Sequence, residues 1–261
     1  DLRDLFSYLM SDIYKNNFIA SLICKIFIYI EKKIILNAIS VNFVSPGFDY
    51  CLNLRLKKKT FYSNGYDENY LKDLKKIKFK DYNKNTITYA GNIGIGQSLE
   101  KFLPTLARFN SNIKYKIIGN GGRLEELKNK INRYKLKNIF LKKQIKRNIL
   151  IKNLKSSDIL LISLADYKSL KYVIPSKIFE YILYKKPIVA NFNGFIKNYS
   201  KKNFDNVFFF KGPRECYKKI QFILKNKKKL KFKKNYKLFS RDKIMNDYTD
   251  HILRLSKKYQ K

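Results

Sequence analysis

The sequence has no tryptophan, a single histidine and only three cysteines. Cys24, Cys51 and Cys216 lie far apart and match neither a metal-ligand spacing nor a disulfide framework, so a reducing compartment fits the chain best. His251 has no serine or carboxylate at a spacing typical of a catalytic group, and we interpret it as a packing or surface residue. The sequence therefore argues against a disulfide-stabilised secreted domain and offers no metal site.

The chain also lacks a signal peptide and an apolar run long enough to span a bilayer. The apolar run at residues 18–30 is interrupted by Lys25 and is followed by three charged residues. This run favours a buried or amphipathic helix, and a helix lying in a membrane interface is the alternative. Because the first residue is not methionine and residues 1–5 resemble the middle of a protein, we expect a fragment that lacks its N-terminal part.

Acidic residues are scarce in this chain. It holds 57 Lys and Arg against 20 Asp and Glu, which gives a formal charge of +37. Such a charge is typical of proteins that bind nucleic acid or anionic lipid. The lysines are scattered, however, except at residues 57–59 and 225–234, and the abundance of Lys, Asn, Ile, Phe and Tyr also fits an AT-rich genome. Whichever of these two explanations accounts for the positive charge, the charge leaves a surface that attracts nucleotide-sugar phosphates or an acidic membrane face.

Hydrophobic residues make up 45% of the 261 residues, enough for a substantial core. From residue 86 onward, short apolar segments alternate with amphipathic ones, which predicts a parallel sheet covered by helices on both faces. The predicted strands are 86–90, 114–118, 138–141, 159–163, 187–190 and 207–210, and the predicted helices are 98–109, 123–134, 149–156, one that opens at 175–176, and 213–224.

The remaining segments are less regular. Before residue 86 we expect helices within 12–38 and at 49–56, with short strands at 41–45 and 60–63. A final amphipathic helix is predicted at 239–255. The pattern divides the chain into the end of a first domain (1–64), a linker with a surface helix (65–85), a second domain (86–225) and a basic segment with a helix that returns toward the first domain (226–261).

Two glycine-rich turns follow predicted strands. Residues 91–96 and 119–122 lie where the carboxyl ends of parallel strands bind ligands, and small residues there let backbone N–H groups approach a diphosphate. The glycine spacing differs from that of dinucleotide-binding proteins, and no Walker lysine motif occurs, which argues against a P-loop nucleotidase. Tight strand-to-helix turns are the alternative interpretation of both segments.

Residues 175–190 carry the most specific signal. A helix is predicted to open at Pro175 and Ser176, where free N–H groups and the helix dipole favour an anion. Lys177 is unfavourable at such a position unless an anion balances it. Glu180, one turn further on, is placed to hydrogen-bond sugar hydroxyls, and a solvated surface carboxylate is the alternative.

Taken in order, the motifs resemble those of retaining glycosyltransferases of family 4, in the bacterial subgroup that builds surface polysaccharides. The resemblance covers nearly the whole chain and depends on the order and spacing of its segments. They are Asp1-Leu2-Arg3-Asp4-Leu5, Val44-Ser45-Pro46-Gly47, Ser63-Asn64-Gly65-Tyr66-Asp67, Tyr89 to Gly94 with Gln97 to Glu100, Ile118-Gly119-Asn120-Gly121, Ser157 to Leu161, and Pro175-Ser176-Lys177 to Glu180-Tyr181 with Lys186-Pro187.

The resemblance implies an α/β fold of GT-B type. It comprises a complete Rossmann-like C-terminal donor domain with a parallel sheet and the C-terminal part of a second Rossmann-like domain. The implied reaction moves a sugar from a UDP-sugar to a glycan or lipid-linked acceptor at the cytoplasmic face of a membrane, with no metal or other cofactor. Peripheral association with an anionic membrane is expected, and specific nucleic-acid binding is not. A basic nucleic-acid-binding protein and a sugar-nucleotide epimerase are the alternatives.

The resemblance also assigns roles to residues. Glu180 would hold the ribose hydroxyls of the nucleotide, and the N–H groups at Ser176 and Lys177, with the loop from Gly91 to Gly94, would cradle the diphosphate. Asn120 would contact the base or ribose. No catalytic residue is assigned, because stabilisation of the departing nucleotide matters more than a protein base. The expected donor-binding residues are Gly91, Asn92, Gly94, Asn120, Ser176, Lys177 and Glu180.

The sequence departs from the family pattern at three places. Tyr172 stands where many relatives have a sugar-contacting Glu, and Lys185 replaces the usual Gly. Asn92 and the Gln97-Ser98 pair stand where many relatives have Arg and Lys to neutralise phosphate. A lysine elsewhere would have to supply that charge, and the candidates are Lys168, Lys171 and Lys177. Since a missing N-terminal segment would hold much of the acceptor site, we expect this fragment alone to be inactive.

Overall fold

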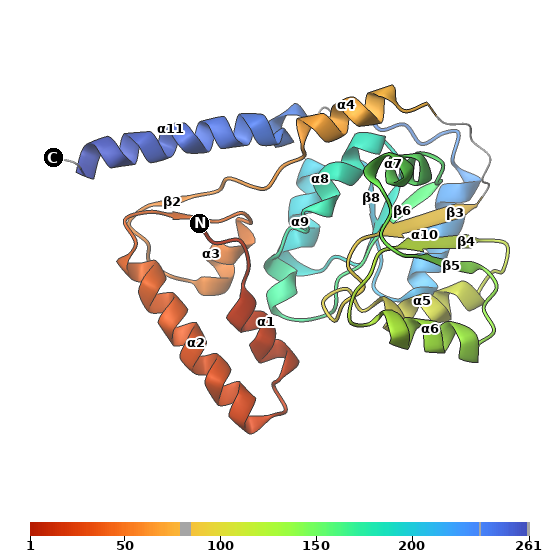
Figure 1. Cartoon of the computed structure of the whole chain (residues 1–261), viewed down its shortest axis with the longest axis horizontal. Helices are drawn as coiled ribbons and strands as arrows, with labels where there is room; N and C mark the ends of the chain where they lie inside the picture. The colour runs from red at the N-terminus through yellow and green to blue at the C-terminus, as the bar shows by residue number, and fades with distance from the viewer. Residues whose placement is uncertain (79–84, 235, 260–261) are drawn as a thin grey trace.

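The computed structural model describes residues 1–78, 85–234 and 236–259 (Figure 1). Its larger part is a six-stranded, fully parallel sheet with strand order β5-β4-β3-β6-β7-β8. This confirms the predicted parallel α/β sheet. No strand end differs from the predicted one by more than one residue. The strands are β3 (Thr86–Ala90), β4 (Lys114–Ile118), β5 (Ile139–Lys142), β6 (Ile159–Ile162), β7 (Ile188–Ala190) and β8 (Val207–Phe209).

The central strands are buried on both faces, which explains the continuous apolar sequences of β6 and β7, whereas β3 also buries Thr86 and Thr88. In β6, Leu160 and Ile162 face one hydrophobic cluster, whereas Ile159 and Leu161 face the other. The first cluster is covered by α4 (Glu68–Lys76), α7 (Arg147–Lys155), α8 (Lys177–Tyr181) and α9 (Gly194–Asn203), and the second by α5 (Leu99–Arg108), α6 (Leu124–Arg133) and α10 (Pro213–Lys225).

The direction in which the chain crosses the sheet reverses beside β3. From β3 the chain passes outward through β4 to β5, and it then returns to β6 on the other side of β3 and continues to β7 and β8. Loops that leave β3 and β6 therefore diverge at the carboxyl edge and leave a crevice between them. The first predicted glycine turn lies at this edge, directly after β3.

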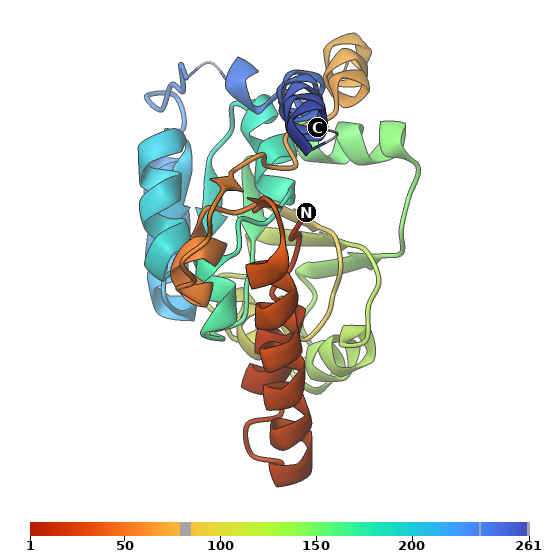
Figure 2. The same ribbon diagram turned by 90° about the vertical axis from the view of Figure 1, so that its left-hand side faces the viewer.

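The N-terminal residues form a smaller unit beside the sheet domain (Figure 2). A third cluster, which includes Phe43 and Phe48, holds it together. The expected helix region 12–38 is two helices, of which the first begins earlier than predicted, and the helix expected at 49–56 ends where Asn53 adopts a left-handed conformation. The elements are α1 (Phe6–Ile13), α2 (Phe18–Asn37), β1 (Val41–Asn42), α3 (Gly47–Leu52) and β2 (Lys59–Thr60).

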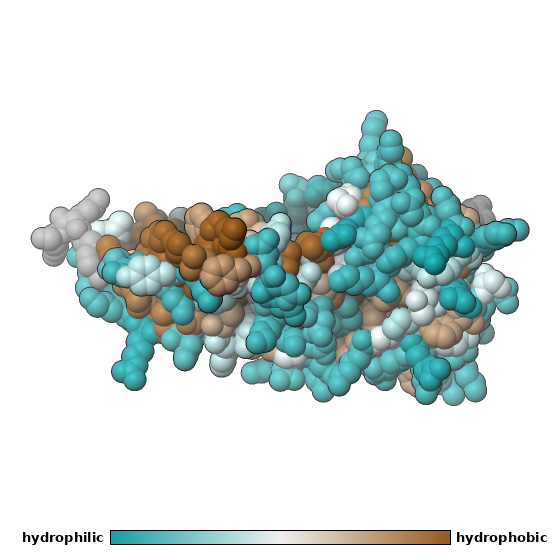
Figure 3. All heavy atoms as spheres, turned by 90° about the horizontal axis from the view of Figure 1, so that it is seen from below, coloured by the Kyte–Doolittle hydropathy of each residue, from teal (hydrophilic) through white to brown (hydrophobic). Residues whose placement is uncertain are grey.

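Helix α2 is apolar on nearly all sides but is mostly exposed. Cys24 and Ile35 are its buried residues, whereas Phe18 is 83% exposed and Ile26 is 53% exposed. Apolar side chains gather on this part of the surface in the space-filling view (Figure 3). No helix in the described part of the chain combines the length and the hydropathy that a bilayer crossing requires.

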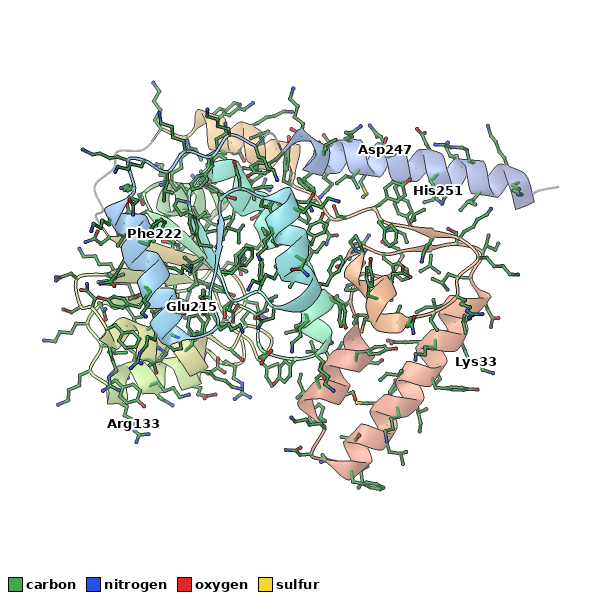
Figure 4. All side chains as sticks on the ribbon, turned by 180° about the vertical axis from the view of Figure 1, so that it is seen from behind. Lys33, Arg133, Glu215, Phe222, Asp247 and His251 are labelled. Atoms are coloured by element: carbon green, nitrogen blue, oxygen red, sulfur yellow. The ribbon has the colours of Figure 1, made fainter. Side chains whose placement is uncertain are left out.

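The chain passes between the two units twice, once near Tyr66 and again near Arg241. At these points the two segments are hydrogen-bonded to each other: the N–H of Tyr66, in the predicted turn, donates to Phe239 O at 2.8 Å, and the N–H of Arg241 donates to Tyr66 O at 2.9 Å. Helix α11 (Arg241–Tyr259), which carries Asp247 and His251, then runs back over the N-terminal unit (Figure 4). There the ring of Tyr248 stacks on that of Tyr62, with 5.0 Å between the ring centroids. His251 also lies against Tyr62, 6.1 Å between ring centroids, as a packing residue.

The linker expected at residues 65–85 packs in part against the sheet domain. Its helix, α4, buries Tyr70 and Leu74 in the first cluster of the sheet domain. Residues 79–84 of the expected linker lie outside the described residues, as do residues 235 and 260–261 of the basic C-terminal segment.

The connection from β6 to α8 packs on the N-terminal unit. It contains a short 3-10 helix, η1 (Ser169–Tyr172), which the sequence did not indicate. Asp12 on α1 accepts two hydrogen bonds from the N–H and hydroxyl of Ser169, both at 2.8 Å. The hydroxyl of Ser45 donates to the carbonyl oxygen of Tyr172 at 2.5 Å. These contacts hold the two units against each other beside the carboxyl edge of the sheet.

Candidate functional site

A cavity of about 540 Å³ opens at the carboxyl ends of β3 and β4. Five of the seven predicted donor-binding residues line it: Gly91, Asn92, Asn120, Lys177 and Glu180. Ala90, Ile118 and Gly119 form its base at the strand ends, and α8 supplies Lys177 and Glu180 from the side. The structure therefore brings together residues from three separate sequence motifs.

Five further residues of this cavity were not predicted. Tyr70 comes from α4, Gln144 and Ile145 come from the connection between β5 and α7, and Arg147 and Leu150 come from α7 itself. No motif spacing marks these residues in the sequence, because their nearness to Glu180 arises only when α4 and α7 pack on the same face of the sheet. Together they add an aromatic ring, an amide and a guanidinium to the expected set.

Arg147 is fixed by charge pairing rather than left free in the cavity. Its guanidinium donates to Asp67 Oδ2 at 3.0 Å and lies 5.3 Å from the ring centroid of Tyr70. This hydrogen bond to Asp67 raises the pKa of Arg147, and the same bond lowers the pKa of Asp67. The crossover turn at residue 67 is thereby tied to the start of α7.

A second cavity, of about 610 Å³, lies between the N-terminal unit and the sheet domain. Its N-terminal wall includes Arg3, Asp4 and Asn64, and burial raises the pKa of Asp4. Ser176 lines this cavity and not the first. Asn92 and Lys177 line both cavities, so the two spaces meet at these residues. Gln97, Ser163, Leu164 and Ile174 complete the wall on the sheet domain.

The glycines of the two turns allow the turns to approach each other closely. A methyl group on Gly119 would stand 1.8 Å from the carbonyl oxygen of Gly91, and one on Gly121 would stand 2.4 Å from Asn92 Oδ1. The backbone links directly across this contact, with Gly91 N–H donating to Ile118 O at 2.8 Å. All three glycines also have positive φ angles, which disfavour other residues.

The same contacts correct one expectation. The N–H of Ile93 donates to Asn120 O at 2.8 Å, and the N–H of Gly94 donates to Gln97 Oε1 at 3.2 Å. With Gly91 also bonded, three of the four N–H groups in the predicted cradle are already used, and Gly94 lines neither cavity. The glycine turn therefore serves close packing more than donation to a ligand, because its donors are satisfied within the protein.

The helix expected at Ser176 is shorter than its sequence suggested. Helix α8 has five residues and continues as the 3-10 turn η2 (Ile182–Tyr184), so its dipole is small. The N–H groups of Ile178 and Phe179 donate to Pro175 O and Ser176 O. Those of Ser176 and Lys177 donate to no acceptor among residues 1–78, 85–234 and 236–259, and they remain available at the rim of the second cavity.

Lys177 reaches across to the glycine turn. A methyl group on Gly91 would stand 2.7 Å from Lys177 Cε and 2.8 Å from Nζ, so the lysine fills the space that a side chain at Gly91 would need. Its ammonium lies 5.7 Å from the ring centroid of Tyr181. Burial lowers the pKa of Lys177, and the nearby charge of Glu180 opposes that shift.

Other candidate positions lie outside the cavities. Tyr172, which replaces a sugar-contacting acid of many relatives, packs against the N-terminal cluster. Lys171 pairs with Asp166 at 3.4 Å, and Lys168 is exposed. Neither lysine lines either cavity, so Lys177 is the one of the three candidate lysines that reaches the site. Across the described ranges, no group of three or more His, Cys, Asp and Glu side chains could hold a metal ion.

Comparisons with known proteins agree with this geometry. The sequence profile of the family described as "Glycosyl transferases group 1" matches residues 72–239, which contain the six-stranded sheet and every residue that lines the first cavity except Tyr70. No curated protein matches the chain significantly.

Solved structures share the fold. Anabaena HepE (Alr3699), crystallised with UDP and glucose, is similar with a TM-score of 0.71 and 14% identity, covering 90% of this chain and 73% of that protein. A glycosyltransferase from Rickettsia africae is similar with a TM-score of 0.62 and 14% identity, covering 86% of this chain and 65% of that protein. The likeness confirms the expected α/β fold of GT-B type with a Rossmann-like sheet domain.

Proposed function

Because the chain belongs to the group 1 glycosyl transferases, we propose that its two joined cavities bind a nucleotide-sugar, with UDP as the nucleotide and a hexose as the sugar. The observation that carries this proposal is that the cavities meet at Asn92 and Lys177. A ligand with a planar base and ribose at one end, a charged diphosphate in the middle and a sugar at the other matches that arrangement.

The nucleoside fits the first cavity. Ile118, Ile145 and Leu150 give that cavity an apolar lining suited to a base, while Glu180 offers carboxylate oxygens to the ribose hydroxyls. Asn120 lies at the same end. The diphosphate then lies where the cavities join, close to the N–H groups of Ser176 and Lys177. HepE, which shares the fold, has been crystallised with UDP and with UDP-glucose, and this supports the choice of UDP.

The sugar fits the second cavity, between the sheet domain and the N-terminal unit. Asp4, Asn64 and Gln97 offer polar atoms there. Transfer with retention of configuration, without a metal ion, is the mechanism that we propose from the family 4 resemblance. Interactions that stabilise the departing nucleoside diphosphate would contribute most, since negative charge develops on it in the transition state.

We further propose a glycan or lipid-linked acceptor in surface polysaccharide synthesis, used at the cytoplasmic face of a membrane. Two surface features support peripheral membrane association: the net charge of +37 and the exposed apolar side chains of α2. Cosedimentation with vesicles tests it. Binding to vesicles rich in anionic lipid, and little binding to neutral vesicles, is the expected result, and equal binding to both would oppose an electrostatic component.

The first test is a substitution at Glu180. We expect Glu180→Ala to weaken UDP binding in calorimetry by roughly 10-fold to 100-fold, because ribose hydroxyls lose a charged acceptor. Glu125→Ala is the matched control, since this carboxylate lies on α6, is 76% exposed and lines neither cavity. Unchanged affinity in Glu180→Ala would remove Glu180 from the site, and a wild-type protein that binds neither UDP- nor GDP-sugars would contradict the proposed function.

Two alternatives give different results in related assays. A nucleic-acid-binding protein would bind DNA or RNA tightly, with an affinity that falls steeply as salt rises. A sugar-nucleotide epimerase would convert the nucleotide-sugar in the absence of an acceptor. If the protein consumes the nucleotide-sugar only when an acceptor is present, this result favours sugar transfer over both alternatives.

A further inference from the structure

We propose that the ammonium group of Lys177 binds the diphosphate of the donor and supplies the positive charge that this chain lacks on its glycine turn. The inference rests on the proposed nucleotide-sugar site and names the side chain that recognises the anionic part of that substrate. Four observations on the described residues support it.

Lys177 stands at the required place. It is one of two residues that line both cavities, and the diphosphate is the part of a nucleotide-sugar that joins the nucleoside to the sugar. The other shared residue, Asn92, is neutral and its side-chain amide donates to Gln97 Oε1 at 3.2 Å. Lys177 is therefore the only cation at the junction within the described part of the chain.

The backbone of the glycine turn offers little to an anion. The N–H groups of Gly91, Ile93 and Gly94 already donate within the protein. A buried donor that is satisfied internally cannot stabilise a phosphate without giving up its first partner. The charge of a diphosphate must then be balanced mainly by a side chain, together with the N–H groups of Ser176 and Lys177.

Lys177 is the unpaired cation of the site. Two other cations line the cavities, and each is held by an aspartate: Arg147 by Asp67 at 3.0 Å and Arg3 by Asp1 at 2.8 Å. Lys177 forms no ion pair with any carboxylate of the described ranges, and burial lowers its pKa. The charge of Glu180 opposes that shift without forming an ion pair with Lys177, and a bound anion would stabilise the partly buried ammonium further.

The close approach to Gly91 explains how the ammonium reaches the junction. A Cβ atom at residue 91 would lie 2.7 Å from Lys177 Cε and 2.8 Å from Nζ, so the glycine leaves the room that the lysine side chain needs. Because Gly91 has a φ of +151°, a substitution there would also strain the backbone, and the test therefore changes Lys177 itself.

The test compares uridine with UDP, measured by calorimetry on the 261-residue protein and its variants. In Lys177→Met we expect UDP affinity to fall roughly 10-fold to 100-fold while uridine affinity is unchanged, because only UDP carries the diphosphate. Lys177→Arg should recover part of the UDP affinity.

Lys168→Met is the matched control, because this exposed lysine lies on the same connection from β6 to α8 but outside both cavities. It should leave both affinities unchanged. Equal loss of uridine and UDP affinity in Lys177→Met, or no loss of either, would overturn the proposed binding of the diphosphate by Lys177. Neither result would contradict the nucleotide site itself. A wild-type protein that binds neither compound would instead overturn the proposed function.

A stability measurement separates this role from a structural one. We expect the melting temperature of Lys177→Met without ligand to equal or exceed that of the wild-type protein, since a partly buried ammonium that forms no ion pair within the described residues is replaced by an apolar chain of similar length. A clear decrease would mean that Lys177 supports the fold, and the proposal would then fail.

Discussion

At the residue scale, buried hydrogen bonds to the ends of the strands position the site. Tyr181 on α8 is almost fully buried, and its hydroxyl accepts a hydrogen bond from Ala90 N–H at 2.9 Å. Ala90 directly precedes Gly91, so this bond joins the helix that carries Lys177 and Glu180 to the strand that carries the glycine turn. Burial raises the pKa of Tyr181 well above its ordinary value, which keeps the hydroxyl neutral.

We therefore predict that Tyr181→Phe destabilises the protein by about 1–3 kcal/mol, because it leaves a buried N–H without its acceptor. Urea unfolding measures the change. Tyr134→Phe is the control, since this tyrosine is 42% exposed and should shift stability by little. If both variants unfold at the same urea concentration as the wild-type protein, the bond to Ala90 contributes nothing to stability.

At the element scale, the turn before α4 is attached to the start of α7 by charge. Asp67 accepts from Asn69 N–H at 2.7 Å as the cap of α4, and it also binds Arg147. The bond from Arg147 holds the pKa of Asp67 below its ordinary value of 3.8. A carboxyl group with a lowered pKa in the folded state stabilises the fold above its unfolded pKa, and this contribution disappears as the pH falls through the folded-state pKa.

Asp67→Asn retains a capping oxygen but removes the charge, so we predict a loss of about 0.2–1 kcal/mol at neutral pH, as for other exposed ion pairs. The difference from the wild-type protein should shrink below pH 3.8, where the carboxyl of the unfolded chain takes up its proton, and should disappear as the carboxyl of the folded protein follows at lower pH. Denaturant unfolding at several pH values measures it. Asp67→Ala should cost more at every pH, because it also removes the cap. A difference independent of pH would exclude the charge as its cause.

At the scale of the whole molecule, the N-terminal unit is held against the sheet domain by a close backbone contact. A methyl group on Gly47 would stand 2.3 Å from the carbonyl oxygen of Tyr172 and 2.7 Å from Phe195 Cδ1. Ser45 and Asp12 bind the same connection. The second cavity lies along this interface, so its width depends on how closely the two units pack.

Gly47→Ala should therefore push the units apart or strain their contact, at a cost of about 1–3 kcal/mol. Thermal unfolding followed by calorimetry is the measurement, and a lower melting temperature or a separate transition of the N-terminal unit is the expected outcome. Gly122→Ala is the matched control, because a methyl group there meets no atom within 4 Å. Equal melting temperatures for the two variants would show that the interface accommodates a side chain at residue 47.

Much of the sheet domain could be predicted because its signals are local. The apolar runs of β3, β4 and β6 alternate with helices whose buried faces repeat at helical spacing, and both patterns lie within each segment. Helix α9 was missed since its ten residues bury little beyond Ile196 and Ser200 and begin with a glycine. The two-residue strands β1 and β2 were predicted too long, because their pairing with each other within the N-terminal unit decides where they end.

The sequence by itself determined the alternation of strands and helices in the sheet domain, indicated the glycosyltransferase family, and predicted Lys177 and Glu180 as donor-binding residues, since these depend on motifs in which nearby residues carry the signal. Only the tertiary structure decided that Tyr70 and Arg147 join that site, that Tyr172 packs on the N-terminal unit, and that the glycine turn uses most of its own N–H groups. The physical reason is that hydrogen-bond partners and cavity walls come from residues far apart in the chain, which become neighbours only when helices pack on the sheet.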